Sequence, residues 1–186
     1  MNKYEVLTRD EFLGYIAYKR RKQQKEKITI KNILLNSLFL ENLHAISFTD
    51  CTFQNCILNG IIRLDNCSLS KSELLTGLDP HFSKTRFNNC VLKCVGETIF
   101  TKNTFGNCSI EKVRNLNLNL CRFVNTDFID CLFYDFKVKR TTFTNSFFRS
   151  CEFPIKLKIK QKIFIGCDFP SRPSSSRPFR KEDIQK

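Results

Sequence analysis

Large hydrophobic residues return at every fifth position through most of the chain, with polar residues between them. An early run contains Ile28, Ile33, Leu38, Leu43, Phe48, Phe53 and Leu58, and a late run contains Leu118, Phe123, Phe128, Phe133, Val138, Phe143, Phe148 and Phe153. This period matches neither the about 3.6 residues of an amphipathic helix nor the roughly two residues of a half-buried strand. It predicts a chain that turns a corner every five residues and points one large side chain inward from each short side. Stacked turns of this kind bury a continuous core.

The cysteines follow the same register. Of the ten, only Cys94 does not lie two positions before a core position; the nine that do are Cys51, Cys56, Cys67, Cys90, Cys108, Cys121, Cys131, Cys151 and Cys167. A position that accepts Cys, Ser or Thr but seldom a large residue is an inward corner with little room. Free cysteine behaves there as a small buried hydrophobe. We therefore expect these cysteines to be buried free thiols.

Residues 51–55 (CTFQN), 126–130 (TDFID) and 151–153 (CEF) follow one pattern: a small residue, a polar residue, then Leu or Phe, before two variable positions. In this pattern, over roughly residues 28–169, the chain resembles the pentapeptide-repeat family. The resemblance implies an all-β solenoid, namely a right-handed four-sided β-helix. The chain departs from the commonest form of the family, because Cys, Thr or Ser stands where Ala is usual and Phe is used more than Leu.

The sequence also contains a longer repeat, with about the length of one complete coil. A fragment of the form apolar-x-Asn/Gly-small-x-apolar starts every 16 to 21 residues, close to one four-sided turn of twenty. This spacing predicts about seven coils. Stacking them would form a column of small residues: Cys56, Ser72, Cys90, Cys108, Thr126, Ser146 and Cys167. It would also form a polar column at a corner, where asparagine can hydrogen-bond local backbone: Asn55, Asn89, Asn107, Asn125 and Asn145.

Three turns are two residues short, and the missing residues fall on one side of the rod. Eight residues replace ten between Leu74 and Phe82, between Leu92 and Phe100, and between Ile110 and Leu118. Each predicts an irregular corner, and the first contains Gly77 and Asp79-Pro80, which favour a turn. Loops that leave a regular scaffold on one side often carry recognition. A tightened corner without a role is the alternative.

Both ends depart from the five-residue period. Thr8 and Glu11 have the spacing of a capping box, and a helix from residue 9 to about 24 follows with an apolar face of Phe12, Leu13, Ile16 and Ala17. This face would cover the open first coil. Residues 156–162 place lysine at every second position, which predicts a strand with a lysine-lined outer face. The chain thus divides into an N-terminal segment with the capping helix (1–27), the β-helix (28–169) and a disordered basic tail (170–186).

The net charge of +13 is unevenly distributed. Residues 1–32 carry nine basic against four acidic residues (+5), residues 154–186 carry nine against three (+6), and residues 33–153 carry thirteen against eleven (+2). The sequence thus predicts a nearly neutral rod with positive ends. These cations either contact a polyanion or partner, or serve helix capping, edge protection and solubility. The candidate contacts are Lys19, Arg20, Arg21, Lys22, Lys156, Lys158, Lys160, Lys162, Arg172, Arg177, Arg180 and Lys181.

Residues suited to catalysis are scarce. The only histidines, His44 and His81, lie at no metal-ligand spacing, and Cys90 with Cys94 lacks the second pair that would complete a zinc site. A cysteine nucleophile needs an exposed thiol of low pKa beside a base, whereas inward cysteines offer the reverse. Since a glycine-rich phosphate loop is also missing, we predict that the protein is not an enzyme and has no metal or cofactor.

Three functions fit these features. The first is a non-enzymatic protein-binding rod that docks onto another macromolecule and inhibits or otherwise modulates it. The resemblance implies a nucleic-acid enzyme such as a type II topoisomerase as one partner, which family members bind by imitating DNA with an acidic surface. This chain lacks an acidic column, so any such contact would differ from DNA mimicry. The alternatives are a nucleic-acid-associated protein that uses its basic ends, and an effector that binds an anionic membrane or a host target.

Ten cysteines without an apolar leader favour a reducing compartment. We therefore expect a cytoplasmic protein, in the host cytoplasm if it comes from a phage or is translocated. Richness in Lys, Asn, Ile and Phe suggests a bacterial or phage genome. No apolar run of about eighteen residues predicts a membrane span. The lysine-rich residues 156–162 favour a monomer over an end-to-end dimer.

Overall fold

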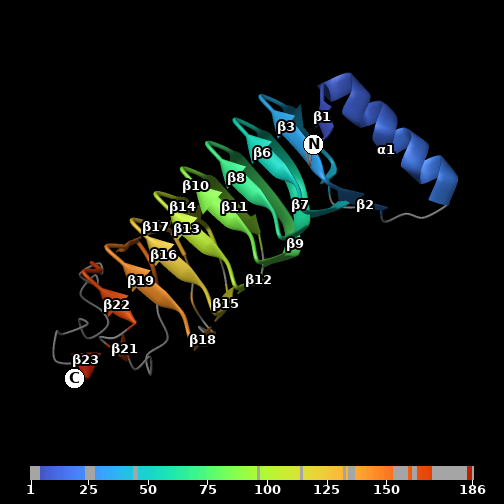
Figure 1. The fold of residues 1–186 in the computed structure, drawn as a ribbon. Coiled ribbons are helices and arrows are strands. Elements are labelled where there is room, and N and C mark those ends of the chain that lie inside the picture. Colours follow the sequence, from blue (N-terminus) through green and yellow to red (C-terminus); the bar gives the residue numbers. More distant parts are fainter. Residues whose placement is uncertain are drawn as a thin grey trace.

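The computed structural model describes residues 5–23, 28–43, 46–95, 97–113, 115–131, 133, 137–152, 159–160, 163–168 and 184–185. They form a parallel β-solenoid of about six turns with one α-helix at its N-terminal end (Figure 1). The strands fall into three sheets of nine, twelve and two strands. The predicted four-sided β-helix with an N-terminal helix is confirmed. The expected seventh coil would include residues 153–158 and 161–162, which lie outside the described residues.

The nine-stranded sheet forms one side of the rod. Every neighbouring pair in it is parallel, because each coil returns to the same side one level further along the axis. In spatial order its strands are β1 (Glu5–Leu7), β3 (Ile33–Asn36), β6 (Thr52–Gln54), β8 (Ser68–Ser70), β10 (Arg86–Asn88), β13 (Thr104–Gly106), β16 (Arg122–Val124), β19 (Thr142–Thr144) and β22 (Phe164–Ile165).

The twelve-stranded sheet covers two further sides, joined by two strands long enough to belong to both, β7 (Ile57–Asp65) and β9 (Glu73–Ser83). One of these sides also contains β4 (Phe39–Leu40), β11 (Val91–Val95), β14 (Ser109–Glu111), β17 (Asp127–Ile129) and β20 (Phe147–Arg149). The other contains β2 (Ile28–Lys31), β5 (Ile46–Thr49), β12 (Glu97–Thr101), β15 (Asn115–Asn119) and β18 (Lys137–Lys139). The two-stranded sheet pairs β21 (Ile159–Lys160) with β23 (Ile184–Gln185).

Phenylalanine rings stacked along the axis form the centre of the core. Phe105, Phe123 and Phe143 are fully buried and pair in register in successive coils. Their neighbouring ring centroids lie 4.5 and 4.8 Å apart with nearly parallel planes. This spacing equals the distance of about 4.8 Å between adjacent strands, so each ring packs directly on the next. The period-five prediction of an interior row is confirmed for this half of the rod.

In the early run, Phe48, Phe53 and Leu58 point inward as predicted, whereas the register of the first coil is offset by two positions. Leu35 pairs with Phe53 and Leu40 pairs with Leu58, whereas Leu38 is only half-buried. Ile33 is buried, but it occupies the corner position that holds Cys51 one coil later. A large residue fits this corner because the first coil has another coil on one side only. The small-residue rule that indicates the register elsewhere therefore does not hold at this end.

On the shortened side of the rod, the first predicted irregular corner is replaced by a continuous strand, and the other two contain residues 96 and 114, which lie outside the described residues. β9 runs without interruption from Glu73 to Ser83, so the turn expected at residues 77–80 is wrong. β7 likewise continues through the side, and the deletion there is larger, since only six residues separate the inward Leu58 from Leu64. Register shifts within the β7–β9 pairing absorb the missing residues. Two sides of the rod therefore merge into one sheet at these levels, with a continuous strand in place of a corner.

Most corners of the solenoid place one residue in the left-handed region of the backbone. Among the described residues, eighteen non-glycine residues have φ between 47° and 59°, and ten of them are Asn or Asp (eight and two). These types tolerate positive φ best after glycine, because their short polar side chains cause little crowding. The predicted asparagine column is confirmed as a corner column. Asn125 in this column bonds to a neighbouring side chain rather than to local backbone, since its Nδ2 donates to Asn107 Oδ1 at 3.1 Å.

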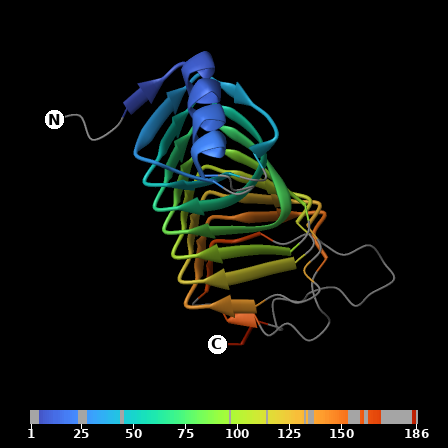
Figure 2. The same ribbon diagram turned by 90° about the vertical axis from the view of Figure 1, so that its right-hand side faces the viewer.

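The helix α1 (Arg9–Gln23) lies at the N-terminal end of the stack of coils (Figure 2). The capping box is confirmed: the Thr8 N–H donates to Glu11 Oε2 at 2.7 Å, and the Glu11 N–H donates to Thr8 Oγ1 at 3.4 Å. Phe12 is fully buried and its ring centroid lies 6.2 Å from that of Phe48. The helix therefore caps the first coil through Phe12 and Ile16, while Leu13 is exposed.

Strand β1 was not predicted from the sequence. It pairs in parallel with β3, so that Glu5 lies beside Ile33 and Leu7 beside Leu35. An unpaired β3 would offer a row of free backbone groups to another chain. β1 therefore continues the nine-stranded sheet beyond the first coil and protects that edge, a task that the sequence reasoning had assigned to the helix alone.

Candidate polyanion-binding site

The predicted basic cluster of the capping helix lies on its last turns. Arg20, Arg21 and Lys22 are exposed, and Lys19 is half-buried. Lys19 Nζ lies 5.2 Å from the ring centroid of Tyr15, and Lys22 Nζ lies 5.8 Å from that of Tyr18. Both contacts are cation–π pairs one helical turn apart. The positive charges also complement the partial negative charge at the helix C-terminus, so this cluster has a structural role without any partner.

The other predicted contact residues are not brought into a described site. Lys160 belongs to β21, but its side chain is not among the described ones. The rest lie outside the described residues: Lys156, Lys158, Lys162, Arg172, Arg177, Arg180 and Lys181.

A different group of six cations lies along one edge of the rod, where the chain passes from the twelve-stranded into the nine-stranded sheet. We call it the basic ridge; it consists of Lys84, Arg86, Lys102, Arg122, Lys139 and Arg140, all exposed. Three of the six, Lys84, Lys102 and Arg140, occupy the left-handed corner of this edge, with φ of 48°, 56° and 48°. The remaining three flank the corner on β10, β16 and β18.

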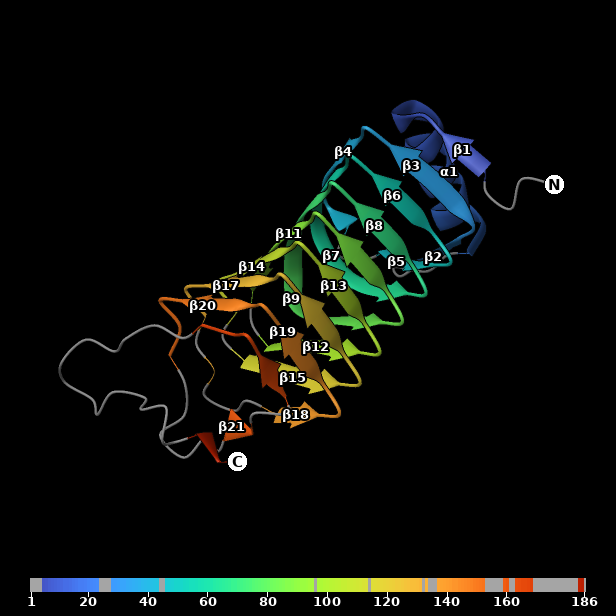
Figure 3. The same ribbon diagram turned by 60° about the vertical axis from the view of Figure 1, so that its left-hand side comes forward.

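Backbone hydrogen bonds place the ridge residues in successive coils. The Lys84 N–H donates to the Thr101 carbonyl at 2.9 Å and the Lys102 N–H to the Asn119 carbonyl at 2.8 Å. The Leu120 N–H then donates to the Lys139 carbonyl at 2.9 Å. Figure 3 shows the two sheets that meet along this edge, with β15 and β18 on one and β16 and β19 on the other. At about 4.8 Å a coil, the ridge spans roughly 14 Å from Lys84 to Arg140.

No acidic residue accompanies these cations on the edge. Residues 83–88, 101–106, 119–124 and 139–144, which form it, contain no Asp or Glu. None of the six side chains makes an ion pair or a hydrogen bond with a described residue. The prediction that positive charge is confined to the two ends is therefore wrong. The net charge of residues 33–153 is only +2 because the positive charge of this edge is offset by acidic residues on other sides of the rod.

The ridge ends toward the N-terminus of the rod. In the two preceding coils, the same corner is occupied by Asp50 and Asn66, and the Asn66 side chain donates to Asp50 Oδ1. Asp65 lies next to this corner and accepts a hydrogen bond from Ser83 Oγ. The edge thus changes from acidic to basic along the axis, and the ridge has a defined starting point at Lys84.

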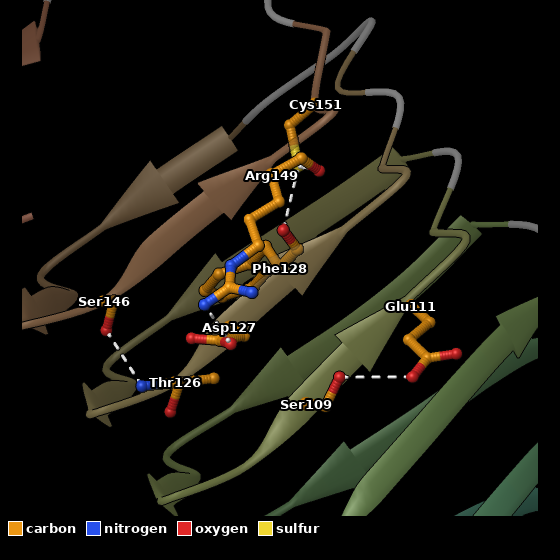
Figure 4. Close-up of polar contacts among 8 residues, drawn as sticks. All are labelled: Ser109, Glu111, Thr126, Asp127, Phe128, Ser146, Arg149 and Cys151. Atoms are coloured by element: carbon orange, nitrogen blue, oxygen red, sulfur yellow. Dashed lines mark hydrogen bonds and ion pairs between the residues drawn. The ribbon is translucent and has the colours of Figure 1, made fainter. Parts of the chain in front are cut away.

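Cations on the side of β9, β11, β17 and β20 are paired, unlike those of the ridge. Lys93 Nζ lies 2.6 Å from Glu73 Oε1, and this hydrogen bond and charge raise the pKa of Lys93. Arg149 Nη2 lies 3.3 Å from Asp127 Oδ2 (Figure 4). The Arg149 guanidinium also lies 5.8 Å from the Phe147 ring centroid. In each exposed pair, the cation and the carboxylate lie in adjacent coils and neutralise each other. Cations available to an external anion are therefore concentrated on the ridge.

The described part of the chain offers little for catalysis. An open hollow of ≈ 490 Å³ lies over Ile57, Glu73 and Val91, beside the corner residues Asn55 and Lys71. Its lining contains no histidine, and its one thiol, Cys56, is buried, which raises the pKa of that thiol. Among the described residues, no three His, Cys, Asp or Glu side chains gather as a metal-ligand group.

All ten cysteines are free, and nine are buried. Burial raises the pKa of Cys94 to about 12 and that of Cys121 to about 11. Several other buried thiols donate to backbone carbonyls, as when Cys151 Sγ donates to the Phe128 carbonyl at 3.3 Å (Figure 4). The expectation of inward free thiols is confirmed for eight of the nine predicted cysteines and extends to Cys94, whereas Cys167 is only half-buried. Thiols enclosed in this way are poor nucleophiles, because reagents do not reach them.

No family model matches the chain, and no curated protein matches it. The resemblance to the pentapeptide-repeat family stays a prediction based on the residues themselves. No helix in the described part of the chain has the length and hydrophobicity to cross a membrane.

The sequence reasoning missed the ridge although a signal was present. Lys84 and Lys102 lie one coil of 18 residues apart, Arg140 follows Lys102 by two coils of 18 and 20 residues, and Arg122 lies two positions after the corner residue between them. Counting charge by position within the coil, instead of by position along the chain, would have gathered them on one edge.

Proposed function

We propose that the chain is a non-enzymatic rod that docks onto another macromolecule and modulates it, and that the basic ridge is its docking surface. The observation that carries this proposal is a row of six exposed, unpaired cations, roughly 14 Å long, on an edge free of acidic residues. The partner is therefore a macromolecule with an extended anionic surface.

Rigidity makes such a row effective. A single exposed ion pair contributes on the order of 0–1 kcal/mol, since ordering two long side chains opposes it. Several cations of one sign on a fixed scaffold act together, because their summed field attracts a polyanion before contact. Here the backbone of each corner is held by hydrogen bonds to the next coil, so the charges are arranged before the partner arrives.

The sign of the ridge bears on the partner that the resemblance implies. An acidic DNA mimic would occupy the DNA-binding surface of a topoisomerase, whereas a basic edge would be repelled from that surface. We therefore propose that any contact with a nucleic-acid enzyme of this kind occurs through its anionic regions or through its bound nucleic acid.

Membrane association is less favoured, because Phe12 and Ile16 of α1 are buried against the first coil. Ten free thiols suit a reducing compartment, so we propose a cytoplasmic location.

A capture experiment with matched variants tests this function. Lys84→Asn/Lys102→Asn removes two ridge charges at left-handed corners, and Asn tolerates that backbone geometry. Lys71→Asn/Lys112→Asn removes two charges at left-handed corners on other edges, with φ of 49° and 58°. Each protein is immobilised on a resin and incubated with a bacterial lysate, which is used with and without nuclease treatment. We expect the control variant to retain the macromolecules that the wild type captures and the ridge variant to lose them. Equal capture by the three proteins would contradict the proposal.

A further inference from the structure

We infer that the basic ridge binds the phosphate backbone of duplex nucleic acid without reading its sequence, an inference that rests on the docking function proposed above. The ridge is straight, since its residues follow the axis of a regular solenoid. One strand of a duplex carries a phosphate about every 3.4 Å of helix axis. A ridge of roughly 14 Å therefore faces about four phosphates of one strand.

The side chains on the ridge are those that contact phosphates. Arginine and lysine supply the charge, and the exposed hydroxyls of Thr104 and Thr142 alternate with Arg86 and Arg122 on the adjacent strand positions. In protein–DNA interfaces, phosphate contacts come from these residue types and determine position rather than sequence. Because no carboxylate lies among them, no ridge cation has to leave an intramolecular partner first.

The ridge lacks the parts needed to read bases. The aromatic residues of its four segments are Phe87, Phe105, Phe123 and Phe143, and all are buried. Single-strand binding depends on exposed aromatic rings for base stacking, so a single strand would gain little here beyond charge. Direct readout requires a helix or a two-stranded ribbon to enter the major groove, and an edge of stacked corners provides neither. These features favour backbone contact with a duplex.

An acidic protein partner fits the ridge less well. Protein interfaces have an apolar core surrounded by a polar rim, and they bury about 800 Å² on each partner. The large apolar side chain exposed within the ridge is Leu120, which is 38% exposed. It occupies the corner between Lys102 and Arg140, where the column of cations is interrupted. A surface made almost wholly of cations and small polar groups complements a phosphate backbone better than a mixed protein surface.

The interruption at Leu120 permits a gain-of-function test. Lys84 and Lys102 show that lysine adopts the corner geometry of this column, with φ of 48° and 56° against 57° for Leu120. Leu120→Lys would therefore complete the column with little change to the backbone. A gain in affinity by this variant could not arise from misfolding, which is the usual difficulty with loss-of-function variants.

The experiment measures anisotropy of a labelled 20-base-pair duplex of mixed sequence with the full chain at 50 and 200 mM salt. Contact with four to five phosphates predicts a loss of roughly 100- to 500-fold in affinity over this range. Lys84→Asn/Lys102→Asn should reduce the salt slope by about two and Leu120→Lys should increase it by about one, whereas Lys71→Asn/Lys112→Asn should match the wild type. Two duplexes of unrelated sequence should bind equally.

Four results would overturn the inference: equal weakening by the ridge and control variants, tighter binding of a single strand, a preference for one duplex sequence, or no duplex binding at 50 mM salt. In the last case, ridge-dependent capture of a protein from nuclease-treated lysate would still support the docking function. If that capture also failed, both the inferred duplex binding and the proposed docking function would be contradicted. Unfolding midpoints of all variants verify that each is folded.

Discussion

The ring of Phe123 lies almost parallel to the ring of Phe105 in the preceding coil, with centroids 4.5 Å apart and an angle of 8° between the planes. Phe143 repeats this arrangement on the other side of Phe123, at 4.8 Å and 7°. The stack extends without a break through Phe87, Phe105, Phe123, Phe143 and Phe164. It connects five successive coils through one row of side chains.

Phe123→Ala should lower the free energy of unfolding by about 3–5 kcal/mol, since it removes a fully buried ring from the middle of the stack and leaves a cavity. Urea unfolding followed by circular dichroism measures the change. Phe147→Ala is the control, because its ring is 40% exposed and its loss should cost less than about 1 kcal/mol. Similar losses for the two variants would show that the stack is not the stabilising element described here.

Leu120→Asn should raise the free energy of unfolding by about 1 kcal/mol. Leu120 has φ of 57° at a corner, where a bulky residue is strained and Asn is not. Leu120→Ala is the control. It also removes the leucine side chain, but alanine keeps the Cβ and lacks the side-chain amide by which Asn tolerates positive φ. If the alanine variant gained as much stability as the asparagine variant, exposure of the leucine would be the cause, and the strain argument would fail.

Asn103 is a buried amide whose hydrogen bonds connect two coils. Its Oδ1 accepts from the Thr85 N–H at 2.8 Å, and its Nδ2 donates to the Phe82 carbonyl at 2.8 Å. Asn103→Val removes both bonds from a dry site and should cost about 2–4 kcal/mol of unfolding free energy. Asn103→Thr should cost less, roughly 1 kcal/mol, because Thr141 Oγ1 accepts from the Cys121 N–H in the same way. Chemical denaturation compares the two variants, and a valine variant as stable as the threonine one would contradict this role.

The folded protein should present a single reactive thiol. Cys167 is half-buried, whereas the other nine cysteines are at most 8% exposed. Burial also raises the pKa of Cys94 to about 12, which leaves little thiolate near pH 8. A disulfide reagent at that pH should therefore react quickly with one thiol in the native state and with ten in urea. Cys167→Ser should abolish the fast phase, and several fast thiols in the native wild type would contradict the buried positions.

The capping box should respond to acid. Hydrogen bonds from the Thr8 backbone and then from its hydroxyl lower the pKa of Glu11 below its ordinary value of 4.5. Because the folded-state pKa is depressed, the stabilisation is present above pH 4.5 and is lost as the pH falls through the lowered value. An NMR titration of the Thr8 amide reports this step. Thr8→Ala should move the Glu11 pKa part of the way back, whereas Thr8→Ser should leave it unchanged; a Thr8 amide that does not titrate with Glu11 would contradict the contact.

The sequence by itself determined the features that lie within one coil or one helical turn. The inward row from Leu118 to Phe148, apart from the half-buried Val138, the small corner cysteines other than Cys167, and the Thr8–Glu11 capping box were predicted correctly. Each depends on residues at most five positions apart, so the local pattern contains the information. The register predicted for the first coil was wrong because Ile33 fills a corner that elsewhere holds a small residue.

Only the tertiary structure decided which cations share an edge. Lys84 and Lys102 occupy the same corner because a coil of 18 residues returns to it, and Arg122 flanks this corner, two positions after the next corner residue, Leu120. An error of one residue in the length of a coil would turn these side chains toward another face. Coil length depends in turn on how β7 and β9 pair across their register shifts, which is a long-range property. Charge summed along the chain therefore could not locate the basic ridge, whereas stacking the coils did.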